Sequence, residues 1–415
     1  MSMAQSNPSA KPLAGLRVLD LTHAAAGPFA AMFLADMGAE VLKIEKPKGG
    51  DGARTMGVPM PHHGPKDSDY FVSLNRNKKG LIVDLTLPEG VALAKELVKH
   101  CDVVLENFRP DVMSRLGLGF DVLKALRPKL VYASISAFGA SGPWSKRPAN
   151  DIIMQSVSGL MGITGEVGGG PVRIGAPISD FSSGLFMLSG VLAALLARDR
   201  HPEGQHVQVA MLEASLNMMS NYIPSVVDLG SKVAKLGRGH AQIVPYQAFL
   251  CADNEYLMIG AFTREFWQNL CRALDKEEWI TDSRFASNPA RLAHRAELVG
   301  ELERIFATRN RDEWAELINA ADVPNSPVFE LHDAVHSEQV KHMHALMSVG
   351  EGEKAVTMVR NPIRVKAWGD FPARPAPTMG ADTYQVLKGL LGKGDAEIDA
   401  LVNAKIVAMH YGGSE

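Results

Sequence analysis

Cysteine is scarce in this chain of 415 residues, which contains only Cys101, Cys251 and Cys271. An odd number of widely spaced cysteines argues against a disulfide framework and is typical of the reducing cytoplasm, where we expect this protein to be located. A surplus of either charge is also missing, because 43 basic and 46 acidic residues leave a formal net charge of −3. The chain therefore has no global positive field that would favour nucleic acid or an anionic membrane as a partner.

Long apolar runs and metal-binding patterns are missing as well. The longest apolar run extends from Gly184 to Ala197. This is shorter than the roughly 20 residues that a membrane-spanning helix needs, so we expect a buried core helix. The one histidine cluster, at residues 332–344, has neither an HExxH pattern nor a cysteine pair beside it. We therefore expect ordinary surface histidines and no bound metal.

The first half of the chain contains alternating strand and helix patterns. Short apolar runs such as "LRVLDLTH" alternate with segments of helical spacing such as "GPFAAMFLADMGA". Strands separated by such helices indicate βαβ units and a parallel sheet, so we predict an α/β fold. The predicted strands are 16–23, 40–47, 80–86, 102–108, 130–139 and 204–212, and the predicted helices are 27–39, 91–100 and 184–198.

Beyond about residue 212 the pattern changes to that of a second, smaller domain. Residues 245–262 have the pattern of a β-hairpin that turns at Asp253-Asn254, amphipathic helices follow in 264–322, and a final helix is expected near 383–391. The length of the chain also exceeds what one core usually serves. We predict a large domain at 1–215 and 354–415, a linker at 216–239, a small α+β domain at 240–325 and a return linker at 326–353.

The first predicted strand–helix–strand unit has the pattern of a dinucleotide-binding fold. Glu45 ends its second strand, where a ribose-binding carboxylate would lie. The glycine fingerprint of such folds is missing, however, because the first turn, "HAAAGP", contains only Gly27. An NAD-dependent oxidoreductase is therefore a weak alternative.

One carboxylate, Asp180, stands directly before the longest apolar run, in "GAPISDFSSG". An acid at a helix start accepts backbone N–H bonds and faces the positive end of the helix dipole, so it can be a simple cap. The same donors would keep the carboxylate ionised, and its small neighbours would leave it accessible as a covalent nucleophile. Both interpretations stay open at this point, and Asp151 in "RPANDIIMQSVSG" is a rival acid in a similar position.

Five motifs spread along the chain are highly specific in combination, although each alone would be weak. They are "LAGLRVLDLTHAAAGPFAAMFLADMGAEVLKIEKP", "DYFVSLNRNKKGLIVDL", "ENFRPDVMSRLGLG", "RPANDIIMQSVSGLMGITG" and "GAPISDFSSG". Together they resemble the class III CoA-transferases, the family of formyl-CoA transferase, carnitine CoA-transferase and α-methylacyl-CoA racemase. Within that family the chain is most similar in character to the succinyl-CoA-dependent dicarboxylate transferases.

The resemblance implies an interlocked homodimer, an intertwined ring in which each chain threads through its partner. It also implies a large Rossmann-like domain that binds CoA, is built from both ends of the chain, and is joined by two linkers to the small domain. Acyl-CoA and small carboxylic acids would then be the substrates, and no cofactor would be bound permanently.

The resemblance assigns site residues by position. Asp180 aligns with the nucleophilic aspartate of the family, which implies a reaction through a mixed anhydride and an aspartyl-CoA thioester on this side chain. Such a site must exclude water, because water would hydrolyse every intermediate. The implied CoA-binding residues are His23, Ala24, Ala26, Lys46, Val83, Asn107, Phe108 and Arg115, and the implied substrate-binding residues are Ala25, Tyr70 and Asp151.

Two departures from formyl-CoA transferase bear on the substrate. Ala25 stands in place of a glutamine near the substrate, and "GRGHAQIVPYQAF" (237–249) replaces a glycine-rich loop. These two departures favour a dicarboxylyl-CoA such as succinyl-CoA over oxalate chemistry. Lys46 replaces an arginine, so we expect a point-charge contact with a phosphate in place of a bidentate one. An acyl-CoA racemase is the alternative within the family, but racemases place a histidine directly before the acid matching Asp151, and this chain has Asn150. A CoA-binding protein without catalytic activity would leave Asp180 unexplained.

Overall fold

The computed structural model describes residues 11–60, 63, 67–352, 355–369 and 373–409. Its contacts divide the chain into two compact units. The larger unit contains residues 1–158, 174–220 and 344–415, and the smaller one contains residues 159–173 and 221–343. The large unit is thus assembled from both ends of the chain, while the predicted boundary at 353–354 lies outside the described residues.

A seven-stranded sheet forms the centre of the large unit, with the strand order β12-β3-β2-β1-β4-β5-β6. Six strands are parallel, and β12 alone pairs antiparallel, with β3 at one edge. The predicted α/β fold with a parallel sheet is therefore confirmed. The strands are β1 (Arg17–Asp20), β2 (Glu40–Glu45), β3 (Lys78–Val83), β4 (Val103–Glu106), β5 (Val131–Ser136), β6 (Gln205–Ala210) and β12 (Val407–Ala408).

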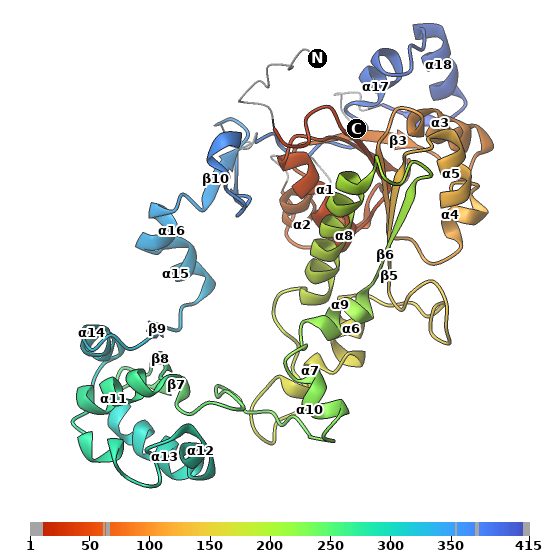
Figure 1. Ribbon diagram of the computed structural model, residues 1–415. Helices are drawn as coiled ribbons and strands as arrows, with labels where there is room; N and C mark the ends of the chain where they lie inside the picture. Colours follow the sequence, from red (N-terminus) through yellow and green to blue (C-terminus); the bar gives the residue numbers. More distant parts are fainter. Residues whose placement is uncertain (1–10, 61–62, 64–66, 353–354, 370–372, 410–415) are drawn as a thin grey trace, which may run out of the picture. The chain divides into compact units, whose positions relative to one another are not determined.

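Helices cover both faces of this sheet (Figure 1). On one face, α1 (Ala26–Asp36) and α8 (Ile178–Ala197) lie side by side and share an apolar core with the strands. On the other face, α3, α5, α17 and α18 pack through buried leucine and valine side chains. Their bounds are α3 (Pro88–Val98), α5 (Phe120–Leu126), α17 (Thr383–Gly389) and α18 (Asp395–Asn403).

The helix α8 begins earlier than the sequence predicts. It starts at Ile178 rather than at residue 184 and is 20 residues long, which gives it the length and apolarity of a membrane span. However, its side chains pack against α1, β5 and β6, as expected of a core helix. The earlier start has one important consequence, because it places Asp180 inside the helix instead of before it.

Shorter elements connect these layers. Two helices of the large unit, α6 (Asp151–Val157) and α9 (Met211–Asn217), contact α8, and a 3₁₀ turn at Gly52–Thr55 contacts α2 (Asp69–Leu74). The remaining elements of this unit are α4 (Val112–Arg115), a 3₁₀ turn at Lys366–Trp368, and the antiparallel pair β10 (Leu346–Val349) and β11 (Val356–Val359).

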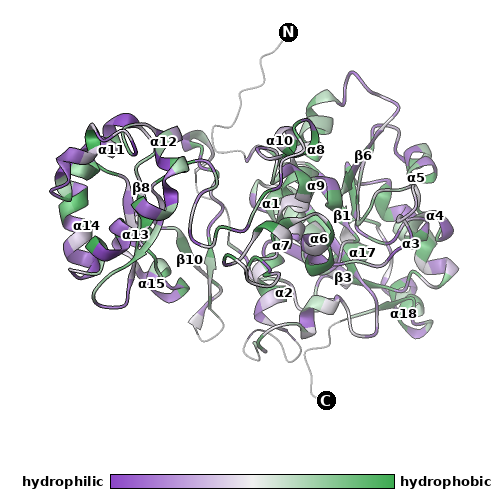
Figure 2. Ribbon diagram, turned by 90° about the horizontal axis from the view of Figure 1, so that it is seen from below, coloured by the Kyte–Doolittle hydropathy of each residue, from purple (hydrophilic) through white to green (hydrophobic). Residues whose placement is uncertain are grey.

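The small unit has its own sheet and its own core. The predicted hairpin is confirmed, since β7 (Tyr246–Leu250) pairs antiparallel with β8 (Tyr256–Gly260), and Asn254 in the turn has a positive φ of 62°. Figure 2 shows hydrophobic and hydrophilic residues alternating along the helices that cover this sheet. The other elements are β9 (Asn325–Pro327), α11 (Arg264–Ala273), α12 (Asn288–Ala293), α13 (Arg295–Phe306), α14 (Arg311–Ala320), a 3₁₀ turn at Glu277–Ile280, α7 (Leu160–Ile163), α10 (Ile223–Val227), α15 (Leu331–His336) and α16 (Glu338–His342).

Candidate active site

Asp180 lies in the first turn of α8, whose N-cap is Pro177. Proline offers no side-chain oxygen, so the N-cap residue leaves the first N–H groups of the helix without a side-chain acceptor. Asp180 itself does not accept these bonds. The interpretation of Asp180 as the cap of this helix is therefore wrong.

Asp151, the first residue of α6, supplies the missing acceptor. Its Oδ1 accepts hydrogen bonds from the backbone N–H of Ser179 at 2.9 Å and of Asp180 at 3.4 Å. Its Oδ2 accepts a bond from Nε2 of Gln155 at 2.7 Å. The capping carboxylate thus comes from a neighbouring helix, which leaves the carboxylate of Asp180 free for other contacts.

The electrostatic setting of Asp180 also differs from the expectation. Burial, together with the negative charge of Asp151, raises the pKa of Asp180 from 3.8 to about 7. The prediction that backbone donors keep this carboxylate ionised is therefore wrong, because those donors bind Asp151 instead. A poorly solvated carboxylate that titrates near neutral pH is a stronger nucleophile than an ordinary surface aspartate.

A cavity of about 280 Å³ opens beside Asp180 within the large unit. Its wall brings together seven of the predicted site residues, although they are spread over almost 160 positions of sequence from residue 23 to residue 180. Those residues are His23, Ala24, Ala25, Ala26, Asn107, Phe108 and Asp180.

The loop between β1 and α1, residues 21–25, forms one side of this cavity. Asn107 holds it through two hydrogen bonds, since its Oδ1 accepts from the N–H of His23 and its Nδ2 donates to the carbonyl oxygen of His23, both at 2.8 Å. The rings of His23 and Phe108 meet edge to face at 5.0 Å. Burial and the charge of Lys43 lower the pKa of His23, so its imidazole is neutral near pH 7.

Tyr70 in α2 is close enough to sense both carboxylates of the site. Burial first, and then the negative charges of Asp180 and Asp151, raise the pKa of Tyr70 to about 12. The phenol is therefore protonated under all ordinary conditions and can act only as a hydrogen-bond donor toward an anion.

Three predicted CoA-binding residues lie outside the wall of this cavity. Lys46 directly follows β2, Val83 ends β3, and Arg115 ends α4, which follows β4. Because β2, β3 and β4 run parallel to β1 in the same sheet, their carboxyl ends lie along the same sheet edge as the β1–α1 loop. Lys46 and Arg115 are exposed there, whereas Val83 is buried.

The sequence did not single out two arginines that the structure brings to the cavity wall, Arg109 and Arg147. Each stands inside a quoted motif, Arg109 in "ENFRP" and Arg147 in "RPAN". A positive charge within a motif of the family was therefore the signal that could have indicated a binding role for these two residues. The guanidinium group of Arg147 lies 4.8 Å from the centre of the Trp144 ring. Within the described ranges, neither arginine forms an ion pair with a carboxylate, so both are available to an anionic ligand.

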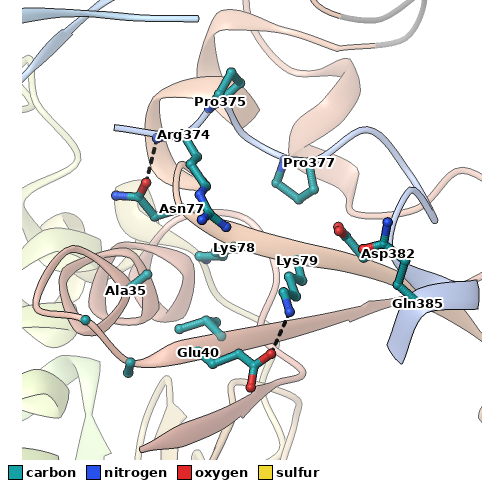
Figure 3. A pocket seen from close by; sticks show the side chains of 13 residues that line it. Ala35, Glu40, Asn77, Lys78, Lys79, Arg374, Pro375, Pro377, Asp382 and Gln385 are labelled. Atoms are coloured by element: carbon teal, nitrogen blue, oxygen red, sulfur yellow. Dashed lines mark hydrogen bonds and ion pairs between the residues drawn. The ribbon is translucent and has the colours of Figure 1, made fainter. Parts of the chain in front are cut away.

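Two other cavities of the large unit offer different chemistry. One of about 570 Å³ lies at the opposite edge of the sheet, where β2 and β3 begin, and Lys79 in its wall is already paired with Glu40 at 2.6 Å (Figure 3). Another of about 580 Å³ adjoins the cavity of Asp180 and contains Glu106, whose pKa is raised to about 7 by burial. Glu106 also accepts a hydrogen bond from the N–H of Phe108 at 2.9 Å. Its raised pKa and its place in an adjoining cavity make Glu106 a second rival to Asp180, besides Asp151.

No group of three or more histidine, cysteine, aspartate or glutamate side chains is arranged to hold a metal ion in the part of the chain that the structure describes. His332 and His336 lie on exposed positions of α15 with their ring centres 4.5 Å apart. The three cysteines are free and buried.

The comparison with protein families identifies the family to which this chain belongs. The model of CoA-transferase family III matches residues 13–383, which is most of the chain. The chain belongs to CoA-transferase family III. It is therefore a CoA-transferring enzyme with acyl-CoA as substrate, and the family resemblance of its motifs is confirmed.

Known relatives of this CoA-transferase span nearly its full length. It is 36% identical over 404 residues to the succinyl-CoA:glutarate CoA-transferase of Mus musculus, covering 97% of this chain and 92% of that protein. It is 35% identical over 365 residues to the acetyl-CoA:oxalate CoA-transferase of Acetobacter aceti, covering 88% and 92%. The crystal structure of Rv3272 from M. tuberculosis in its orthorhombic form matches with a TM-score of 0.80 at 34% identity, covering 90% and 98%.

Proposed function

We propose that this CoA-transferase moves CoA from succinyl-CoA, or another dicarboxylyl-CoA, to a carboxylic acid acceptor, with Asp180 as the covalent nucleophile. One observation carries the proposal: Asp180 is a partly buried carboxylate with a pKa raised to about 7, and it opens onto the cavity that contains His23, Asn107 and Phe108. Glu106, the rival acid, lies in the adjoining cavity.

The proposed reaction exchanges acyl groups on one side chain. The Asp180 carboxylate attacks the thioester carbonyl of the donor, the C–S bond breaks, and a mixed anhydride and CoA thiolate form. The thiolate attacks the Asp180 carbonyl, which gives an aspartyl-CoA thioester and releases the donor acid. The acceptor carboxylate then attacks the aspartyl-CoA thioester, and the released thiolate takes the acceptor acyl group, which restores Asp180.

The surroundings of Asp180 support such a sequence of steps. The thioester energy is conserved only if water is excluded, and the apolar wall of Ala25, Ala26 and Phe108 is suited to that task. The phenol of Tyr70 stays protonated and can donate a hydrogen bond to an oxyanion. The negative charge of Asp151 repels the ionised carboxylate of Asp180. Acylation of Asp180 removes the charge of that carboxylate, so it relieves the repulsion between the two side chains.

A dicarboxylate substrate is favoured by charge. Both relatives named above act, by their names, on a dicarboxylate, glutarate in one case and oxalate in the other. When one carboxylate of such an acid reacts, the other needs a cation, and Arg109 and Arg147 in the cavity wall can supply it. The racemase alternative lacks comparable support, because the position before Asp151 is Asn150, which accepts the N–H of Ile153 at 3.3 Å as the N-cap of α6.

The decisive experiment traps the intermediate. Wild-type enzyme incubated with succinyl-CoA and hydroxylamine should carry a hydroxamate on Asp180, located by peptide mass spectrometry. The Asp180→Asn variant should lose CoA transfer, while Glu106→Gln should still become labelled on Asp180. Labelling of Glu106, or full transfer activity in Asp180→Asn, would refute the mechanism.

A screen of acyl-CoA donors against carboxylic acids identifies the substrates. Exchange of the α-proton of a 2-methylacyl-CoA in the absence of an acceptor acid would instead support the racemase.

We also propose that the active form is a homodimer in the cytoplasm. The single chain leaves large apolar side chains of α8 exposed, with 47% of Leu185, 39% of Phe186 and 84% of Leu196 accessible. A helix of this apolarity is suited to contact with a second copy. Light scattering after size-exclusion chromatography should give twice the chain mass of 44.8 kDa, and a monomer would contradict this part of the proposal.

A further inference from the structure

Ala24, in the wall of the cavity beside Asp180, has an unusual backbone conformation. Its φ is 61°, in the left-handed region that residues with a Cβ rarely adopt. Such a residue keeps this conformation only when its surroundings impose it. The β1–α1 loop is therefore held in shape by contacts outside itself.

A buried ion pair beneath the loop provides those contacts. Oδ1 of Asp51 accepts the N–H of Ala24 at 3.0 Å, and Oδ2 of Asp51 lies 2.9 Å from Nζ of Lys43. The same Nζ donates to the carbonyl oxygen of Thr22 at 2.8 Å. The pair thus binds the loop on both sides of His23, at Thr22 and at Ala24, and both charged side chains are fully buried.

This pair keeps its charges over the whole working range of pH. Burial opposes ionisation of Asp51, but Lys43 and the N–H groups of Ala24 and Ala53 outweigh it and lower the pKa of Asp51 to about 2. The pKa of Lys43 is raised, because Asp51 and two further carboxylates overcome the effect of its burial. Buried ion pairs add little net stability compared with apolar packing, so the location of this one calls for another explanation.

Ala26, which follows the loop and begins α1, is in direct contact with the helix that carries Asp180. A Cβ on Gly184 of α8 would lie only 2.5 Å from the carbonyl oxygen of Ala26, so α8 and the start of α1 approach as closely as a glycine allows. The rings of Phe29 and Phe181 stack at 4.6 Å beside this contact. Because Ala24 and Asp180 line the same cavity, a shift of the loop changes the space in front of Asp180.

We propose that Asp51 is a positioning residue for acyl transfer: with Lys43 it holds Ala24 in the left-handed conformation, so that the β1–α1 loop places the thioester opposite Asp180. This inference rests on the proposed function of Asp180. Asp51 itself does not line the cavity, and it acts through the backbone of Ala24.

Two variants separate positioning from general stability. Asp51→Ala removes the acceptor of the Ala24 N–H, whereas Asp51→Asn keeps an oxygen at Oδ1 and removes only the charge. Asp36→Ala is the matched control, because Asp36 is equally buried and paired with Arg76 at 2.7 Å, but it lies at the other end of α1. Melting temperature, kcat and KM for succinyl-CoA are measured for each variant.

We expect Asp51→Ala to lower kcat/KM by about tenfold or more, since a small displacement of reacting groups costs at least this factor. Asp51→Asn should lose less, and Asp36→Ala should lower the melting temperature but keep kcat/KM within about twofold of wild type. The specific test is rescue: adding Ala24→Gly to either Asp51 variant should restore kcat/KM at least about threefold, because glycine adopts a positive φ without penalty.

Equal losses in the Asp51 and Asp36 variants would overturn the inference, as would the absence of rescue by Ala24→Gly. If Asp51→Ala does not fold, the rescue is read in the Asp51→Asn background. Failure of the proposed function has a different signature, namely transfer activity in Asp180→Asn. That result leaves the comparison of Asp51 with Asp36 interpretable, because the two are compared within the same assay.

Discussion

Replacing Asp180 with asparagine should stabilise the protein while it abolishes transfer. The side chain is nearly isosteric, but it cannot ionise, so the variant avoids placing a charge in a partly buried site next to Asp151. In the wild type the pKa of this carboxyl is raised, from 3.8 to about 7. Between these two values the unfolded chain releases the proton and the folded chain keeps it, so wild-type stability falls as the pH rises from about 4 to about 7.

The size of the effect follows from the same shift. A difference of about three pKa units at about 1.4 kcal/mol per unit gives an upper bound of about 4 kcal/mol at pH 8. The carboxyl of Asp180 is partly open to solvent through its cavity, which screens the charge, so we expect about 2 kcal/mol. For a unit of this size that corresponds to an increase of about 4 °C in melting temperature.

The assay is thermal unfolding of both proteins at a series of pH values from 4 to 8. The advantage of Asp180→Asn over wild type should be smallest at pH 4 and should reach its full value above pH 7, because other titrating groups cancel in the difference. Asp199→Asn is the control, since Asp199 is exposed and paired with Lys129 at 2.9 Å, and its effect should not grow with pH. An advantage of Asp180→Asn that stays constant or shrinks with rising pH would refute the electrostatic description of the site.

Three further outcomes test the geometry around Asp180. In the wild type, kcat/KM for the acyl-CoA should rise with pH and level off above an inflection near pH 7, because the carboxylate is the reactive form. Asp151→Ala should move this inflection to lower pH by removing a like charge, and should cost about 1 kcal/mol of stability as a lost helix cap, measured by rate profiles and chemical denaturation. Gly184→Ala should cost about 1–3 kcal/mol and lower kcat/KM, because its Cβ meets the carbonyl oxygen of Ala26. Gly300→Ala is its control, since a Cβ there meets nothing within 4 Å, and equal losses in the two variants would argue against the close contact.

The large-unit sheet could be predicted from the sequence because five of its six parallel strands are short, mostly buried apolar runs, whereas β6 at the edge of the sheet is only partly buried. Each predicted run overlaps the observed strand. The edge strand β12 was not predicted, since its two residues are recognisable only through their pairing with β3. The start of α8 was also missed, because "ISDFSS" has no apolar periodicity and forms a helix only where Asp151 supplies the cap.

The candidate site was predictable in its members but not in its interactions. Motif resemblance pointed to Asp180 and to the residues that share its cavity. Neither resemblance nor spacing indicated that Asp151 would take the backbone donors of α8, because the two acids are separated by 28 residues of sequence and meet only when α6 packs on α8. The raised pKa of Asp180 follows from that contact, so it could not be inferred before the tertiary structure was known.

The pairing of β12 with β3 has a consequence for the order of folding. Val83 and Ile82 of β3 pair with Val407 and Ala408 of β12. The N–H of Ile82 also donates to Oγ1 of Thr383 in α17, 301 residues later in the chain, at 3.2 Å. During synthesis the entire small unit emerges before the segment that closes this edge of the sheet. Until then β3 exposes unpaired backbone groups, which are a template for pairing with other chains. Loss of the last 30 or so residues would therefore endanger solubility during synthesis, although every residue of the cavity beside Asp180 would already be present.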